Sequence, residues 1–306
     1  MLNFTIRRFL QAIPTLLILI TLSFFMMRLA PGNPFSSDRN LPPQVLANIE
    51  AKYGLDAPLY QQYFRYMNNL LHGDLGPSFK YRDFSVNDLV EQAFPVSIKI
   101  GIYAFIIAVV LGVSIGVMAA LKQNSWLDHA LMIFAMVGVV IPSFIKAQLL
   151  IMIFAVWLRW LPAGGWNGGP WNYMLLPVVS LAIGYIASIA RITRSSMLEV
   201  LHTNFIRTAK AKGLPLYYIV CHHALKPALL PVMAYLGPAF VGIITGSVVV
   251  ETIFGLPGIG QLLVNGSLNR DYAMVLSLTI IIGALTIFFT AVVDILYALI
   301  DPKIRY

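Results

Sequence analysis

The chain has 306 residues, of which 58% are hydrophobic and 11% are charged, and its mean hydropathy is +0.78. Soluble globular proteins carry about 25% charged residues, so most of the surface of this chain cannot face water. Its only cysteine, Cys221, excludes an internal disulfide framework and a cysteine-based metal cluster within the chain.

Apolar runs of about 20 residues, long enough to cross about 30 Å of hydrocarbon, recur along the sequence. The first run follows Arg7 and Arg8. It is longer than a signal-peptide core and has no small-residue cleavage site after it, so we interpret it as a retained helix. Pro142 lies inside the third run and predicts a kink or an opened turn there. The predicted spans are residues 9–29, 96–121, 130–158, 174–194, 227–250 and 273–299.

Basic residues gather on one face of the membrane if these helices alternate in direction. The stretch 191–226 alone carries six Lys and Arg against one acid, Glu199. Because Lys and Arg collect in cytoplasmic loops, that face is predicted to be cytoplasmic, and both termini lie on it. The net charge of +8 therefore reflects topology, and we expect no nucleic-acid partner. Four tryptophans on the opposite face are typical of an interfacial aromatic belt: Trp157, Trp160, Trp166 and Trp171.

The segment after the first span, residues 31–95, is polar and broken by prolines. Helical apolar spacing within it predicts short amphipathic helices over residues 44–52 and 58–71. Two interpretations stay open, a lid on the membrane surface and a docking surface for a periplasmic protein. We divide the chain into residues 1–94, the first transmembrane helix with this segment, and residues 95–306, the transmembrane core with its cytoplasmic loop.

Two small-residue motifs predict places where helices approach each other closely. They are Gly112-x-x-x-Gly116 in the second span and Gly242-x-x-x-Gly246 in the fifth. Such motifs occur in many polytopic proteins, so they indicate packing and carry no information about a substrate.

The chain shows no machinery for using an energy source. It lacks the G-x-x-x-x-G-K-[ST] phosphate loop, and the glycine-rich stretch 255–260 has no lysine. No motif predicts catalytic residues, a bound metal or a cofactor. Charges within the apolar runs, Lys146 and Asp294, with Glu251 near the end of the fifth, leave a stand-alone ion-coupled transporter as a distant alternative.

The cytoplasmic segment 204–215, with the sequence NFIRTAKAKGLP, is the most informative in the chain. Residues 205–212 suit a short helix, Gly213 is placed for a left-handed C-terminal cap, and Pro215 prevents continuation. Ala209 is small enough for another protein surface to come close.

This segment resembles the coupling loop of ABC-importer permeases, whose signature is E-A-A-x-x-x-G followed by I-x-L-P. The chain has Arg207-Thr-Ala-x-x-x-Gly213 and then Ala228-x-Leu230-Pro231. The arginine in place of glutamate and the longer gap are similar to the peptide and nickel branch of the family. Three further stretches resemble that branch: Glu251–Gln261 with Asn269–Tyr272, Gly73–Ser78, and Asp301–Arg305.

The resemblance implies an all-α membrane protein with about six transmembrane helices and the type I ABC importer permease fold, in a bacterial inner membrane. The expected function is that of a non-enzymatic pore subunit of a peptide importer, with permeases for dipeptides, glutathione or nickel as the alternative. The implied partners are a second, homologous permease in a heterodimer, two cytoplasmic ATPase subunits, a periplasmic peptide-binding protein and membrane lipid.

Site residues follow from the same resemblance. The residues expected to contact the ATPase are Phe205, Thr208, Ala209, Lys210, Gly213 and Leu214. Thr245 and Ser247, among small residues of the fifth span, are expected to line the substrate path, because a peptide needs room and polar partners.

Overall fold

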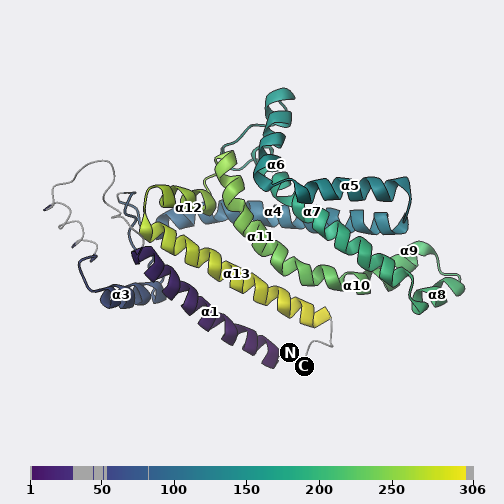
Figure 1. Ribbon diagram of the computed structural model, residues 1–306, viewed down its shortest axis with the longest axis horizontal. Helices are drawn as coiled ribbons and strands as arrows, with labels where there is room; N and C mark the ends of the chain where they lie inside the picture. The colour runs from purple at the N-terminus through teal and green to yellow at the C-terminus, as the bar shows by residue number, and fades with distance from the viewer. Residues whose placement is uncertain (1, 30–43, 45–50, 52–53, 82, 301–306) are drawn as a thin grey trace.

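The computed structural model describes residues 2–29, 44, 51, 54–81 and 83–300, and every regular element among them is a helix (Figure 1). Five of these helices are long and apolar enough to cross a membrane, and one bent pair forms a sixth candidate. The prediction of an all-α membrane protein with about six spans is therefore confirmed. The five are α1 (Leu2–Leu29), α4 (Val86–Leu121), α7 (Trp171–Leu201), α11 (Leu230–Phe254) and α13 (Tyr272–Ile300).

The bent pair replaces the single long third span of the sequence analysis. Helix α5 (Trp126–Val140) meets α6 (Ser143–Leu150), which continues as the π-helical η1 (Ile151–Trp157), at an angle of 108°. Pro142 precedes α6 directly, and its ring and missing N–H prevent α5 from continuing. The predicted kink is confirmed, and Figure 1 shows α6 turning away from the layer of α4 and α5.

Helix α7 lies at the centre of the transmembrane part, against α4, α5, α6 and α11. Both small-residue motifs face it. A Cβ atom added to Gly116 of α4 would lie 2.5 Å from the Ala190 carbonyl oxygen, and one added to Gly242 of α11 would collide with Tyr185. Gly116 thus allows α4 to approach the backbone of α7, and Gly242 leaves room on α11 for the Tyr185 side chain.

Helices α1 and α13 pack side by side, and α3 (Leu59–Leu71) lies against their outer ends. Phe24 of α1 is fully buried there, with its ring centroid 5.4 Å from that of Tyr63 on α3. The amphipathic helix predicted over 58–71 is therefore confirmed. The one predicted over 44–52 lies outside the described residues, apart from residues 44 and 51.

Short helices lie at the two ends of the molecule. At one end, Figure 1 shows α8 (Asn204–Ala211) and α9 (Leu216–Ile219), followed by η2 (Val220–Ala224) and α10 (Leu225–Ala228). At the opposite end α12 (Ile259–Leu268) leads into α13. The proposed division between residues 94 and 95 falls inside α4, directly before Pro95.

Candidate functional site

Helix α8 has the boundaries that the sequence predicts for a coupling helix. It ends at Ala211 with Lys212 as its C-cap, and Gly213 adopts the left-handed conformation with φ +77°. The N–H of Gly213 donates to the Lys210 carbonyl at 3.0 Å, and the N–H of Leu214 donates to the Ala209 carbonyl at 3.4 Å. These bonds satisfy the last carbonyls of the helix, after which Pro215 begins α9. The predicted helix and its glycine cap are confirmed.

The inner side of α8 is fixed to the rest of the chain by an apolar cluster, which we call the loop cluster. Ile206 and Ala209 contribute to it from α8, with exposed fractions of 0% and 7%. Its other buried members come from α4, α7, α9, η2 and α10, and they are Ala120, Met197, Ile219, Val220, Ala224 and Ala228. Because buried apolar surface holds both sides together, α8 and the cytoplasmic ends of α4, α7 and α10 form one packed unit.

The outer side of α8 is exposed. Phe205 leaves 50% of its surface uncovered, and Thr208, Lys210 and Gly213 are also exposed. The structure therefore separates the predicted contact residues into two groups. Phe205, Thr208, Lys210 and Gly213 face outward, whereas Ala209 lies in the loop cluster and Leu214 is half-buried against it.

The two residues expected along the substrate path lie on different sides of α11. Thr245 is exposed, and its hydroxyl donates to the Val241 carbonyl at 3.1 Å. Ser247 is 2% exposed within the chain, and its hydroxyl donates to the Ile244 carbonyl at 2.7 Å. Side chains two positions apart on a helix point about 200° away from each other around its axis. Thr245 and Ser247 therefore cannot line the same surface.

An ion pair that the sequence analysis missed ties α5 to α7 near the same end. Arg194 donates from Nε and Nη2 to the two oxygens of Asp128, both at 2.6 Å. Asp128 is 1% exposed in the first turn of α5, and Ser125 begins that helix as its N-cap. The sequence signal was the Ser-x-x-Asp spacing of a helix start, which does not indicate the distant arginine.

The charges within the spans have partners inside the chain. Lys146 donates to the Gly138 carbonyl at 3.0 Å, across the break between α5 and α6. Asp294 lies 3.4 Å from Arg8 of α1. Lys146, Asp294 and Glu251, which the sequence left without a role, thus lie in separate parts of the fold.

Glu251 accepts a hydrogen bond from the glycine-rich stretch 255–260, which leads into α12. Its carboxylate is fully buried at the end of α11 and accepts a hydrogen bond from the Gly260 N–H at 2.7 Å. Ser97 of α4 accepts another from the Ile259 N–H at 2.9 Å. These contacts occupy backbone donors at the start of α12, where a phosphate loop would offer free ones. Among the described residues no group of three His, Cys, Asp or Glu is arranged to hold a metal ion.

Comparison with known proteins gives the family. Residues 112–306 match the family described as binding-protein-dependent transport system inner membrane component, and residues 1–101 match the N-terminal part of such membrane components. The chain is 69% identical, over all 306 residues of both proteins, to the oligopeptide transport system permease proteins OppB of Salmonella typhimurium and Escherichia coli. It is 44% identical to the dipeptide transport system permease protein DppB of Bacillus subtilis, covering 100% of this chain and 98% of that one.

Solved structures agree on the fold. An inward-facing structure of the MetNI methionine ABC transporter superimposes with a TM-score of 0.60 at 17% identity, over 70% of this chain and 96% of that chain. In importers of this kind ATP hydrolysis belongs to separate ATPase subunits, so this chain is not the enzyme. The chain therefore belongs to the family of binding-protein-dependent transport system inner membrane components, as a multi-pass permease of the bacterial inner membrane with the type I ABC-importer fold.

Proposed function

We propose that this chain forms half of the translocation pore of an ATP-driven oligopeptide importer. The identity of 69% to oligopeptide permeases, against 44% to a dipeptide permease, supports oligopeptides as the cargo. The other half of the pore is a second, homologous permease, and a periplasmic peptide-binding protein delivers the cargo. Residues 95–306 supply the pore and the coupling loop, and residues 1–94 supply the first span and the periplasmic segment.

The observation that carries this proposal is the two-sided construction of α8. Its exposed residues include a large aromatic one, Phe205, together with Thr208, Lys210 and Gly213. We propose that this exposed side docks on a cytoplasmic ATPase subunit. Its buried side, Ile206 and Ala209, passes any displacement to the helix ends that share the loop cluster.

The proposed cycle follows from this arrangement. ATP binding closes the pair of ATPase subunits and brings the coupling helices of both permeases together. The ends of α4, α7 and α10 that pack on α8 move with it, because a close-packed apolar cluster has low compressibility and transmits a displacement. The pore changes from inward-facing to outward-facing, receives the peptide, and returns after product release. On α11, Thr245 is the residue whose exposure suits the peptide path, whereas Ser247 supports the helix from inside.

The test is peptide uptake and ATPase activity of the complete complex in liposomes with the peptide-loaded binding protein. Phe205→Ala removes the aromatic contact and is expected to lower ATP-driven uptake at least about tenfold, since aromatic hot spots carry about 2 kcal/mol or more. The matched control is Tyr217→Ala, another exposed aromatic residue at the same end, 72% exposed and outside α8, which should leave uptake unchanged.

Two results would contradict the proposal. One is full uptake and full ATPase stimulation by the Phe205→Ala complex. The other is peptide uptake by this chain alone in liposomes, driven by a proton gradient, which would favour an ion-coupled transporter.

A further inference from the structure

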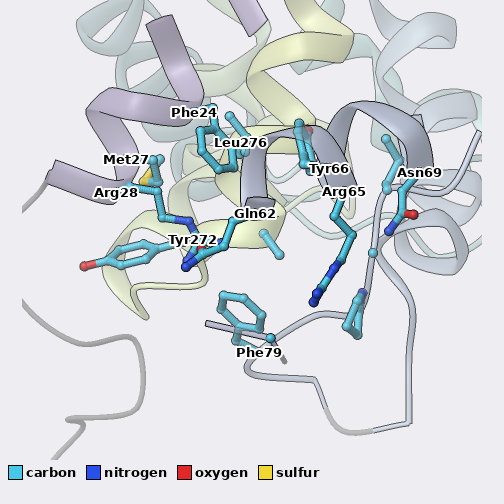
Figure 2. A pocket seen from close by; sticks show the side chains of 15 residues that line it. Phe24, Met27, Arg28, Gln62, Arg65, Tyr66, Asn69, Phe79, Tyr272 and Leu276 are labelled. Carbon is cyan, nitrogen blue, oxygen red and sulfur yellow. The ribbon is translucent and has the colours of Figure 1, made fainter. Parts of the chain in front are cut away.

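A pocket of about 270 Å³ lies at the outer ends of α1 and α13, where α3 packs against them (Figure 2). Its apolar wall includes Phe24 and Leu276, and Phe79 closes it from the loop after α3. Figure 2 shows two guanidinium groups reaching into this space, that of Arg28 from α1 and that of Arg65 from α3. The pocket therefore combines apolar walls with two positive charges.

The pocket lacks a matching negative charge among the described residues. None of its described lining residues is an aspartate or a glutamate. Two carboxylates directly adjoin lining residues in sequence. Asp74, next to Leu75, accepts a hydrogen bond from the Gly76 N–H at 2.8 Å. Asp271, next to Tyr272, accepts hydrogen bonds from the Ser78 hydroxyl at 2.5 Å and from the N–H groups of Phe79 and Met274, both at 3.2 Å. Its charge is thus used to hold the loop. Two arginines that share a cavity repel each other, so an anion bound between them is favoured.

Two buried polar groups, from Gln62 and Tyr66, also lie in the pocket wall. The Oε1 atom of Gln62 is buried without a hydrogen bond, whereas its amide nitrogen donates to the carbonyls of Leu55 and Ala57. The Tyr66 hydroxyl is also buried, close to the side chain of Ser277. Burial raises the pKa of Tyr66 to about 12, so the hydroxyl keeps its proton at neutral pH and remains a donor. A ligand with both acceptor and hydroxyl groups would suit this pair.

The depth of the pocket identifies the source of the anion. Arg28 is in the last turn of the α1 span and Tyr272 begins α13, so both mark the outer boundary of the hydrocarbon. Neighbouring residues of α1 are apolar and uncovered, with Leu22 57% and Met26 71% exposed. The cavity is below the roughly 300–1,000 Å³ of sites that enclose a whole small molecule, which fits a headgroup and not a peptide.

We propose that this pocket binds the headgroup phosphate of an anionic phospholipid of the outer leaflet, with a hydroxyl-bearing headgroup such as that of phosphatidylglycerol. Arg28 and Arg65 hold the phosphate, because a planar guanidinium donates two parallel hydrogen bonds to phosphate oxygens. The acyl chains lie along the exposed apolar side of α1. The bound lipid joins α1, α3 and α13, and it does so whatever cargo the pore carries.

The test is native mass spectrometry of the purified complex with equal amounts of phosphatidylglycerol and phosphatidylcholine. The wild type is expected to retain phosphatidylglycerol preferentially. The double variant Arg28→Gln with Arg65→Gln should weaken its retention about tenfold or more, since charge-assisted hydrogen bonds to phosphate contribute most of the affinity. The matched control is Arg159→Gln, on the outer side but outside the pocket, which should retain the lipid as the wild type does.

A second double variant distinguishes the loss of a binding site from the loss of folded structure. Arg28→Lys with Arg65→Lys keeps both charges, so it should retain more lipid than the glutamine pair and less than the wild type. Equal retention of phosphatidylglycerol in the wild type and the glutamine pair would overturn the proposal. Equal retention of phosphatidylcholine and phosphatidylglycerol would overturn it too, as would displacement of the lipid by millimolar inorganic phosphate, which would identify a site for free anions.

Discussion

At the residue scale, one ammonium group binds a carbonyl that the break between α5 and α6 leaves free. Pro142 ends α5, which leaves carbonyls of its last turn without helical partners, and Lys146 donates to one of them, that of Gly138. A positive charge at the C-terminal end of a helix is also favoured by the helix dipole. Gly184 of α7 makes the room, because a Cβ atom there would lie 3.0 Å from the Lys146 Nζ atom.

Gly184→Ala should therefore displace the Lys146 ammonium and cost about 1 kcal/mol, the typical worth of one hydrogen bond. Lys146→Met removes the same bond, so the two changes are expected to be less than additive in the double variant. The measurement is the apparent melting temperature of the purified protein for both single variants and the double variant. Fully additive losses would show that the glycine and the lysine act separately.

The Asp128–Arg194 pair makes a second prediction at this scale. Asp128→Asn leaves the guanidinium of Arg194 without its carboxylate and should cost about 1.5–3 kcal/mol, as for hydrogen bonds to charged groups. The control is Arg191→Gln, an exposed arginine one turn earlier on α7. Thermal unfolding compares the two. A loss in Arg191→Gln as large as that in Asp128→Asn would mean that the pair is not what holds α5 to α7.

At the element scale, close packing of α7 between α4 and α11 depends on glycine positions that the sequence reveals through their spacing. The sequence could not say which helix each motif faces, because spacing describes one helix and not its neighbour. It also could not separate the sides of α8. Phe205 and Ala209 look equally available in the sequence, yet Ala209 is covered by residues such as Met197 and Ile219 that are distant along the chain.

Two glycines of α4 provide a matched comparison. Gly116→Ala would place a Cβ atom 2.5 Å from the Ala190 carbonyl oxygen and should cost about 1–3 kcal/mol through overpacking. Gly101→Ala on the same helix meets nothing closer than 3.8 Å and should be neutral or stabilising by up to about 1 kcal/mol. Thermal unfolding of both variants checks this. Equal effects would show that α4 and α7 are not in the described contact.

At the scale of the whole molecule, apolar runs and the positions of basic residues were enough to predict the class, the spans and the helix over 205–212. The 108° break was foreseen only as a kink at Pro142, because its angle depends on what α6 packs against. The pocket at the outer end was not predicted, since Arg28, Arg65 and Tyr272 meet there from three separate segments. Local sequence patterns do not predict contacts between segments that are distant along the chain.

The central claim is that the exposed side of α8 is where an ATPase subunit acts on this pore subunit. The most direct measurement is photo-crosslinking from a benzophenone side chain in place of Phe205, in the assembled complex in membranes. We predict a crosslink to the cytoplasmic ATPase, and none to it from the same group in place of Trp160, 70% exposed near the outer end. A crosslink from position 205 to a periplasmic protein, or none to the ATPase in a complex that transports peptide, would contradict the account.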